Sequence, residues 1–303
     1  MQRIQGRGLA GLAGARRLAG LALLCSCTCA GAQPSPPEQL RAHFEAARAL
    51  PAAKVFDRPL VLQSTEGASS LQGEVDALVD QPFEAVRDAF TRPGAWCDIL
   101  ILHLNVKYCR ATGEALDVGI GRKFDQPLSD VYWVRFDYRA APGRDDYLDV
   151  RLQAAEGPMG TKDFRIGVEA APYAAGKTLV HMTYAYRYGL AAHWALNAYL
   201  ATLGSGKSGF SIVGQGADGQ PVRIGGERGV LERNTMRYFL AIEVYLGARS
   251  LPPAQRQARQ LLDWFNATER YPQLHEIDRD AYLAMKQHEV QRQQTEAAPA
   301  RPN

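Results

Sequence analysis

Residues that could carry acid–base chemistry are few and scattered along this 303-residue chain. Asp98 and His103 are the one acid–base pair at near-helical spacing that we single out for inspection. We find no H-E-x-x-H helix, no G-x-S-x-G turn and no set of His and Cys residues at metal-ligand spacing. The sequence therefore predicts no catalytic residue, no metal site and no cofactor.

Two cysteines remain once the three in the first 32 residues are set aside, and an oxidising compartment would favour a bond between them. Pro93 suits a first helical turn, and Trp96 and Ile99 follow at helical spacing, which places Cys97 on a helix and Cys109 on the strand after it. Their Cα atoms could then approach the roughly 4.4–6.8 Å that a bridge needs. A disulfide, two buried thiols and a nucleophilic Cys97 are the three alternatives.

The hexapeptide GSGKSG at 204–209 matches G-x-G-x-x-G and resembles the end of a Walker A loop. A phosphate-binding loop follows a strand and opens a helix whose N-terminus faces the anion. Here the glycines follow a predicted helix at 190–203 and precede a strand at 210–213. We therefore interpret the segment as a connector rather than a nucleotide site.

The strand predicted at 178–188 carries a row of aromatic side chains on one face. Tyrosines on the inner face of a strand would give a pocket wall both apolar area and hydroxyl groups, although a core edged by tyrosines is the alternative. His181 and Arg187 fall on the opposite face, where we expect surface positions. The row consists of Val180, Met182, Tyr184, Tyr186 and Tyr188.

The first 32 residues have the three zones of a secretory signal: a basic start, the apolar stretch LAGLALLCSC and a small-x-small end at Ala30, Gly31 and Ala32. We predict that residues 1–32 are removed and that the protein is periplasmic or extracellular. The sequence LCSC is an imperfect lipoprotein box, so lipid anchoring at Cys27 is the alternative.

Removing that segment takes away four arginines and leaves 31 basic against 32 acidic residues. A nearly neutral mature chain has no dense basic face for a nucleic-acid partner. The remaining 271 residues are enough to bury the core of one elaborated domain.

Alternation and helical periodicity predict an α+β fold with a curved antiparallel sheet wrapped around a long C-terminal helix, plus extra helices. A helix and linker at 33–59 come first, and a polar stretch at 112–123 separates the opening unit from the hairpins. The main predicted elements are a strand at 71–80, two short helices and a second strand before 110, hairpins at 131–153 and 164–188, a further hairpin at 210–224 and an amphipathic helix at 231–248. A helical appendage at 251–294 and a disordered tail at 295–303 follow.

The segment VDALVDQPFEAVRDAF at 75–90, the aromatic hairpins and the helix ERNTMRYFLAIEVYL at 232–246 resemble the START-like, polyketide-cyclase-like superfamily, also called SRPBCC or helix-grip. The resemblance covers residues 60–250. It implies a ligand-binding domain, because members bind lipids, sterols, plant hormones or polyketides between sheet and helix, and some are enzymes.

We therefore expect an exported protein that binds a hydrophobic, lipid-like small molecule between the sheet and the helix from Leu231. A cyclase- or hydrolase-type enzyme on the same fold is one alternative. An envelope protein that uses the uncharged helix at 190–203 for partner or peripheral membrane contact is another. The predicted lining residues are Tyr132, Phe136, Tyr184, Tyr186, Tyr238 and Ile242.

Overall fold

The computed structural model describes residues 35–141, 143–189 and 206–295. The predicted signal at 1–32, the apolar segment at 190–203 and all but the first residue of the tail at 295–303 lie outside the described residues. Within the described part, no helix combines the length and the apolar character needed to cross a membrane.

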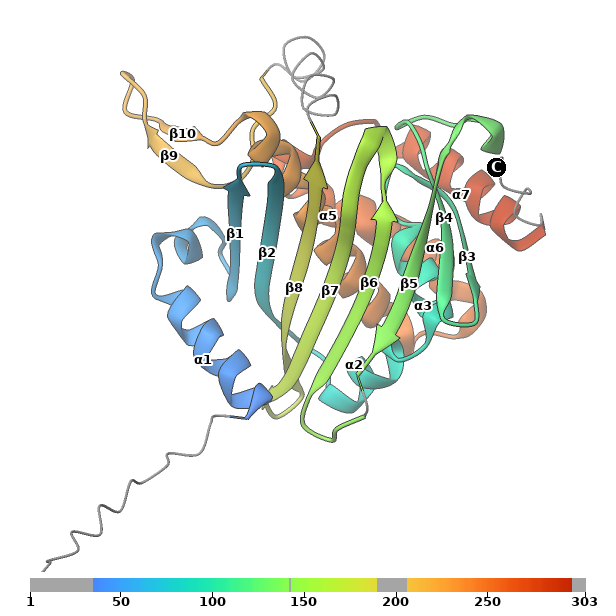
Figure 1. Ribbon diagram of the computed structural model, residues 1–303, viewed down its shortest axis with the longest axis horizontal. Helices are drawn as coiled ribbons and strands as arrows, with labels where there is room; N and C mark the ends of the chain where they lie inside the picture. Colours follow the sequence, from blue (N-terminus) through green and yellow to red (C-terminus); the bar gives the residue numbers. More distant parts are fainter. Residues whose placement is uncertain (1–34, 142, 190–205, 296–303) are drawn as a thin grey trace, which may run out of the picture. The chain divides into compact units, whose positions relative to one another are not determined.

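Eight strands form one antiparallel sheet in the order β1-β2-β8-β7-β6-β5-β4-β3 (Figure 1). All neighbours are consecutive in the chain except β2 and β8, so the chain crosses to the far edge after β2 and returns strand by strand. The bounds are β1 Leu60–Gly67, β2 Ser70–Val79, β3 Val106–Thr112, β4 Ala115–Ile120, β5 Tyr132–Ala140, β6 Leu148–Glu156, β7 Thr161–Ala174 and β8 Lys177–Tyr188.

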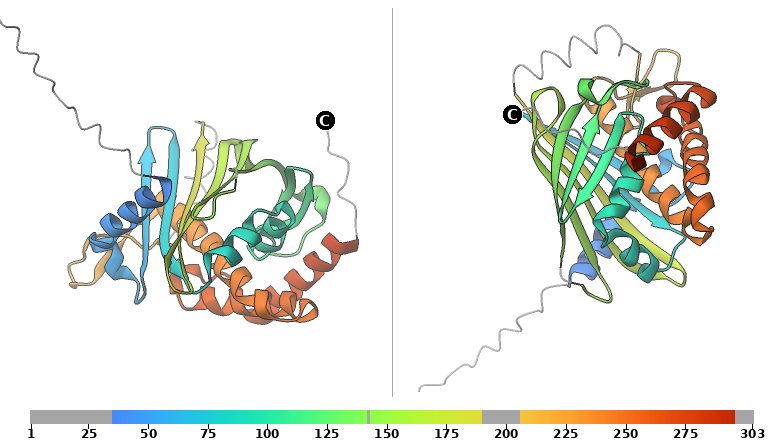
Figure 2. Two further views of the ribbon diagram at one scale, coloured as in Figure 1. Left: turned by 90° about the horizontal axis from the view of Figure 1, so that it is seen from below. Right: turned by 90° about the vertical axis from the view of Figure 1, so that its right-hand side faces the viewer.

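The long helix α5 (Gly226–Gly247) passes behind the central strands in Figure 1, and α6 and α7 stack on the same side (Figure 2). Short helices α2 and α3 make the crossing between β2 and β3. The remaining α-helices are α1 Pro36–Arg48, α2 Phe83–Phe90, α3 Pro93–Leu100, α6 Pro253–Glu269 and α7 Arg279–Thr295. Single 3-10 turns are η1 Pro51–Val55, η2 Leu128–Asp130, η3 Pro158–Gly160, η4 Ala248–Ser250 and η5 Pro272–Leu274.

Alternate residues of β8 belong to two different cores, because successive side chains of a strand point to opposite faces. Val180, Met182 and Tyr184 join the main core together with α5. Leu179, on the other face, packs with Leu40 and Phe44 of α1 in a smaller cluster. The predicted α+β sheet wrapped around a long helix is therefore confirmed, and α1 covers part of the outer face.

The close approach of α5 to the sheet depends on a glycine. A Cβ atom at Gly73 of β2 would lie 2.2 Å from Oγ1 of Thr235, a buried residue of α5 whose hydroxyl donates to the carbonyl of Leu231 at 2.8 Å. Real Cβ atoms do not approach a heavy atom this closely. Gly73 thus lets the helix lie directly on β2.

Charged side chains of α5 are buried as well, which its predicted amphipathic pattern did not indicate. The carboxylate of Glu232 is fully buried and accepts hydrogen bonds from Ser64 Oγ at 2.6 Å and from the backbone N–H of Phe210 at 2.6 Å and of Ser211 at 2.9 Å. Glu232 therefore fixes α5 to β1 and to the segment that leads into the last hairpin.

Several predicted elements differ from the observed ones. The stretch at 112–123, predicted only as polar, contains β4, whose Leu116 and Val118 are buried. Helix α5 begins at Gly226, five residues before the predicted start at Leu231. The predicted last hairpin is present as β9 (Ile212–Gln215) and β10 (Pro221–Arg223), but it forms a separate two-stranded sheet.

Of the three alternatives for Cys97 and Cys109, the disulfide is the one observed. The two residues form a disulfide that joins α3 to β3, with 5.1 Å between their Cα atoms. A helix followed by a strand brings the pair together, as the helical spacing around Cys97 predicted.

Replacing Gly73 with alanine should lower the free energy of unfolding by about 1–3 kcal/mol, because the added methyl group overpacks the contact with Thr235. Gly167→Ala is the matched control, since its Cβ would meet Thr183 at an ordinary 3.8 Å. Urea denaturation of both variants measures the difference, and equal stabilities would contradict the proposed close contact.

A variant with both Cys97 and Cys109 replaced by alanine should be less stable by about 3 kcal/mol, because the bridge closes a loop across a sequence separation of 12. Thermal unfolding of this variant beside the oxidised parent checks the value. Unchanged stability, with the bond verified in the parent by mass spectrometry, would show that the bridge constrains nothing.

Candidate functional site

A cavity of about 170 Å³ lies between β7 and β8, the helix α5 and the loop that follows α3. Phe164, Tyr184 and Tyr186 come from the sheet, and Asn234 and Tyr238 come from α5. Sheet and helix therefore form opposite walls. The remaining lining residues are His103, Asn105, Ile120, Pro158, Met159, Thr161 and Tyr188.

The aromatic walls contact one another. The ring of Tyr184 lies 5.2 Å from that of Tyr238 and 5.4 Å from that of Phe164, and Phe164 stacks on Tyr186 at 5.8 Å between centroids. Burial raises the pKa of Tyr184, Tyr186 and Tyr238 above the usual value of 10. All three hydroxyls therefore carry their protons at neutral pH and can donate hydrogen bonds.

His103 is the histidine among the described lining residues. Its ring is 2% exposed and stacks on Tyr238 with 4.5 Å between ring centroids. Burial, followed by the positive charges of Arg237 and Lys286, lowers the pKa of His103 well below 6.5, so the imidazole is neutral. Nδ1 accepts the backbone N–H of Asn105 at 3.2 Å, which assigns the ring proton to Nε2.

Nε2 of His103 is buried and has no hydrogen-bond partner among the described residues. A buried donor without a partner costs roughly 1–3 kcal/mol. A ligand atom that accepts this N–H would recover part of that free energy, because the atom gives up its own hydrogen bond to water. His103 lines the cavity, so its Nε2–H is the candidate polar contact for a ligand.

Buried charges lie behind His103, between β3 and α7. Lys107 and Lys286 both contact the carboxylate of Glu289, at 2.8 and 2.5 Å, and all three side chains are fully buried. Lys286 also donates to the carbonyls of His103 at 3.2 Å and Val106 at 2.7 Å. Two cations against one anion leave a net positive charge near His103, which favours a neutral imidazole and a negative or oxygen-bearing ligand.

The helices α6 and α7, predicted as part of an appendage, contribute to this wall. Trp264 of α6 and Tyr282 of α7 belong to the main core cluster and stack on each other at 5.1 Å. The Tyr282 hydroxyl donates to the carbonyl of Leu102 at 2.9 Å, directly before His103. The C-terminal helices therefore position the loop that carries His103.

A third buried carboxylate, Glu276, contacts three cations. Its oxygens lie 2.5 Å from Lys207 Nζ, 2.6 Å from Lys123 Nζ and 2.9 Å from Arg237 Nη2. Burial alone would raise the pKa of Glu276, but Arg237 and the hydrogen bonds from Lys123 and Lys207 lower it to about 2. Lys207 of the GSGKSG segment thus has a structural partner.

The sequence-predicted lining residues fall into two groups. Tyr184, Tyr186 and Tyr238 line the cavity. Phe136 and Ile242 are buried in the main core, where the Phe136 ring contacts Phe164 at 5.8 Å, but neither lines the cavity.

Tyr132 lies apart from the others. It is the first residue of β5 and is 55% exposed, since the alternation that continues through Val134 and Phe136 does not bury the end of the strand. No ligand contact tests these six positions, so their ligand-binding role stays a prediction.

The pair that we singled out for acid–base chemistry is not brought together at the cavity. His103 lines it, whereas Asp98 lines a separate depression with Arg92 and Tyr245. Sequence reasoning also missed the donor role of His103, because its neutral state depends on burial and on the charges of Arg237 and Lys286, which are distant in the chain.

A larger depression, of about 780 Å³, lies near the connector, and its lining mixes Phe56, Phe210 and Tyr271 with the cations Arg58, Lys207, Arg223 and Arg270. Two of these cations already have carboxylate partners, Glu243 for Arg58 and Glu276 for Lys207. None of the described residues that line the smaller cavity is Asp, Glu, Lys or Arg, and most are aliphatic or aromatic. The smaller cavity therefore suits an apolar molecule better and is the candidate binding site.

The element order decides the fold. An opening strand pair, two short helices, a run of antiparallel strands that returns to β2, and a long helix across the inner face follow one another in the chain. This is the helix-grip fold. The fold predicted from the START-like resemblance is therefore confirmed, with the C-terminal helices α6 and α7 added beyond α5.

No family model and no curated protein matches the sequence. Similar solved structures include human StAR-related lipid transfer protein 5, with 10% identity, a TM-score of 0.35 and coverage of 71% of this chain and 96% of that one. Ara h 8.0201 has 10% identity, a TM-score of 0.34 and coverage of 59% and 99%. Norcoclaurine synthase from Thalictrum flavum, in complex with dopamine and hydroxybenzaldehyde, has 12% identity, a TM-score of 0.31 and coverage of 48% and 89%.

Replacing Glu276 with glutamine should lower the free energy of unfolding at pH 7 by about 2–3 kcal/mol, because three cations lose their counter-charge. The native pKa of about 2 lies below the ordinary 4.5, so the contribution of Glu276 is complete above pH 4.5 and is lost as the pH falls toward 2. The difference between parent and variant should shrink over that window in urea titrations.

Glu269→Gln is the control for this experiment, because Glu269 contacts only the exposed His275 in the described structure. A difference that stays constant from pH 5 to pH 2.5, or an equal effect of both substitutions, would contradict the stabilising role of the Glu276 charge.

Proposed function

We propose that the protein binds a hydrophobic small molecule in the cavity between the sheet and α5. The observation that carries the proposal is an aromatic cavity whose lining includes an unpartnered buried donor, Nε2 of His103. Apolar walls supply affinity through removal of apolar surface from water, at about 25 cal/mol per Å². The donor supplies orientation.

The cavity volume limits the ligand. A cavity of about 150 Å³ lined by apolar side chains holds benzene, whereas drug-sized ligands need roughly 300 Å³ or more. At about 170 Å³, the described cavity holds a substituted ring or the end of a lipid chain. The ligand is thus a small aromatic molecule, or a lipid of which one end enters.

The polar groups around His103 are hydrogen-bond donors, so they favour a ligand that carries a hydrogen-bond acceptor. Nε2–H of His103 and the protonated tyrosine hydroxyls are donors, and Arg237 and Lys286 give this region a positive potential. A carbonyl or carboxylate oxygen suits both properties. We therefore infer an apolar ligand that bears one such oxygen.

The lining supports binding rather than hydrolysis. General acid–base catalysis needs a titratable group within hydrogen-bond reach of the reacting atom. None of the described lining residues is Asp, Glu, Lys or Arg, and the pKa of His103 is lowered so far that it acts as a donor rather than as a base near neutral pH.

We also propose that the mature protein is exported and works outside the cytoplasm. The signal-like residues 1–32 and the disulfide between Cys97 and Cys109 support this, since structural disulfides persist in oxidising compartments. Anchoring at Cys27 and membrane contact through residues 190–203 stay predictions.

Binding can be tested with two probes that differ in one acceptor, acetophenone and ethylbenzene, by saturation-transfer and chemical-shift NMR. We expect both to bind the parent protein and acetophenone to bind more tightly. Ile120→Trp should abolish binding of both, because the larger side chain fills the cavity. Tyr132→Ala should bind as the parent does, because that side chain lies outside the cavity.

His103→Phe keeps an aromatic ring but removes the donor, so it should weaken acetophenone binding by roughly two- to tenfold and leave ethylbenzene unchanged. Circular dichroism verifies that each variant is folded. Equal probe affinities in Ile120→Trp and Tyr132→Ala would refute the cavity as the binding site.

A further inference from the structure

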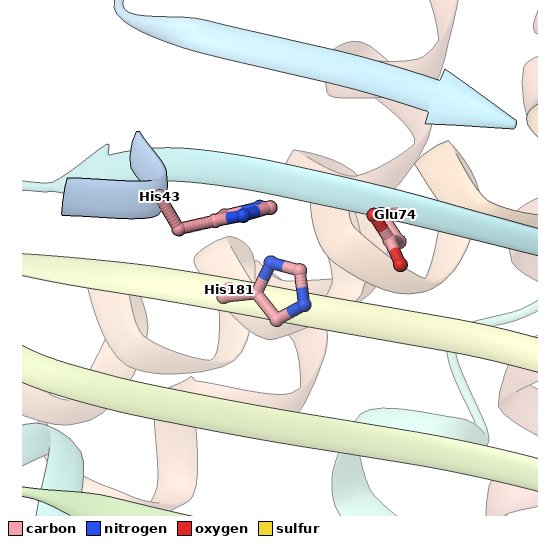
Figure 3. A group of neighbouring side chains, drawn as sticks. All are labelled: His43, Glu74 and His181. Carbon is pink, nitrogen blue, oxygen red and sulfur yellow. The ribbon is translucent and has the colours of Figure 1, made fainter. Parts of the chain in front are cut away.

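We propose that His43, Glu74 and His181 bind one divalent transition-metal ion, for which zinc is the best match. The three residues come from α1, β2 and β8 and converge on the outer face of the sheet (Figure 3). One ligand atom from each lies within 4.8 Å of the others. The site is on the opposite face from the aromatic cavity and does not depend on the proposed ligand binding.

The pairing of β2 with β8 places two of the three ligands, Glu74 and His181. In the antiparallel register of β2 and β8, Asp76 lies opposite His181 and Glu74 lies opposite Thr183. Glu74 and Asp76 are two residues apart, so both side chains point to the same face as His181. Glu169 of β7 lies opposite His181 on its other side and adds negative charge to this face.

Helix α1 supplies the third ligand. Phe44 and Leu40 bury the helix against the outer face, and Arg41 donates to the carbonyl of Pro172 from Nε at 3.1 Å and Nη2 at 2.8 Å. These contacts place the neighbouring His43 over the strands. Its ring lies 5.1 Å from the ring of His181 in an edge-to-face arrangement.

A buried carboxylate orients both imidazoles. Asp76 is 1% exposed; its Oδ1 lies 2.8 Å from Nδ1 of His181 and its Oδ2 lies 3.2 Å from Nε2 of His43. Each ring thus has one nitrogen committed to Asp76, which leaves Nδ1 of His43 and Nε2 of His181 for an ion. Nε2 of His181 lies 3.2 Å from Oγ1 of Thr183, and an ion would replace that contact. A carboxylate that fixes the second nitrogen of a ligating histidine is the usual outer shell of zinc sites.

The donor set favours zinc. Two imidazoles and one carboxylate are a common zinc set, which leaves the fourth tetrahedral position for water. At bond lengths of about 2.1 Å the ligand atoms would lie about 3.4 Å apart, so the cluster must contract around the ion. The side chain of His43 is 45% exposed and Glu74 is half-buried, which gives both room to move inward.

Zinc binding can be measured on untagged mature protein after treatment with EDTA, by isothermal titration and by competition with a chromogenic chelator. We expect one zinc ion per chain. His43→Ala and Glu74→Gln should each weaken binding at least tenfold, and Asp76→Asn should weaken it by about 10–100-fold. His288→Ala is the control, because His288 is an exposed histidine that contacts Asp125.

A second measurement separates specific binding from misfolding. Zinc should raise the melting temperature of the parent and of His288→Ala but not of His43→Ala, whose exposed side chain is removable without loss of the fold. Absence of stoichiometric zinc in the parent, or equal zinc affinities in His43→Ala and His288→Ala, would overturn the proposal.

Discussion

The alternation of side chains along β8 is the constraint on which both candidate sites depend. Because successive residues of a strand face opposite sides, Tyr184 and Tyr186 point toward α5 while His181 points toward α1. A shift of one residue in the pairing of β2 with β8 would exchange the two sets. The aromatic cavity and the histidine cluster are therefore back to back on one strand, and the register that forms one also forms the other.

Burial of charge is the second theme of the structure. Three carboxylates make buried contacts. Glu232 anchors α5, Glu276 anchors the segment before α7, and Glu289 anchors α7. Removing ions from water is costly, and each contact stabilises the fold only because every partner is present. Burial lowers the pKa of His103, and Arg237 and Lys286, which pair with Glu276 and Glu289, lower it further. The imidazole is therefore neutral and its Nε2–H is available.

The helices and strands that the sequence predicted are those whose apolar residues recur with a clear period. The strand and two helices from 71 to 100, the hairpins up to Tyr188 and the helix α5 follow the alternation and the helical spacing of their apolar residues. Strand β4 was missed because its short ALDVGI run contains a glycine and an aspartate and gives too weak a pattern. Tyr132 was placed on the inner face by alternation, which says nothing about where a strand leaves the core.

The sites themselves were less predictable. The tyrosine row indicated an aromatic wall, but the Nε2–H of His103 depends on Asn105, Arg237 and Lys286 together, which only the fold assembles. His181 was expected at the surface, yet it is only 9% exposed because α1 covers it. Spacing within one segment cannot reveal a cluster built from α1, β2 and β8.

The disulfide between Cys97 and Cys109 restrains the loop that carries His103. His103 is the middle residue of the loop that Cys97 and Cys109 close, six residues from each. A loop pinned at both ends has few conformations to lose when a ligand arrives, so the imidazole is held ready before binding. Reduction would release that loop, so the binding that we propose would depend on the redox state of the surroundings.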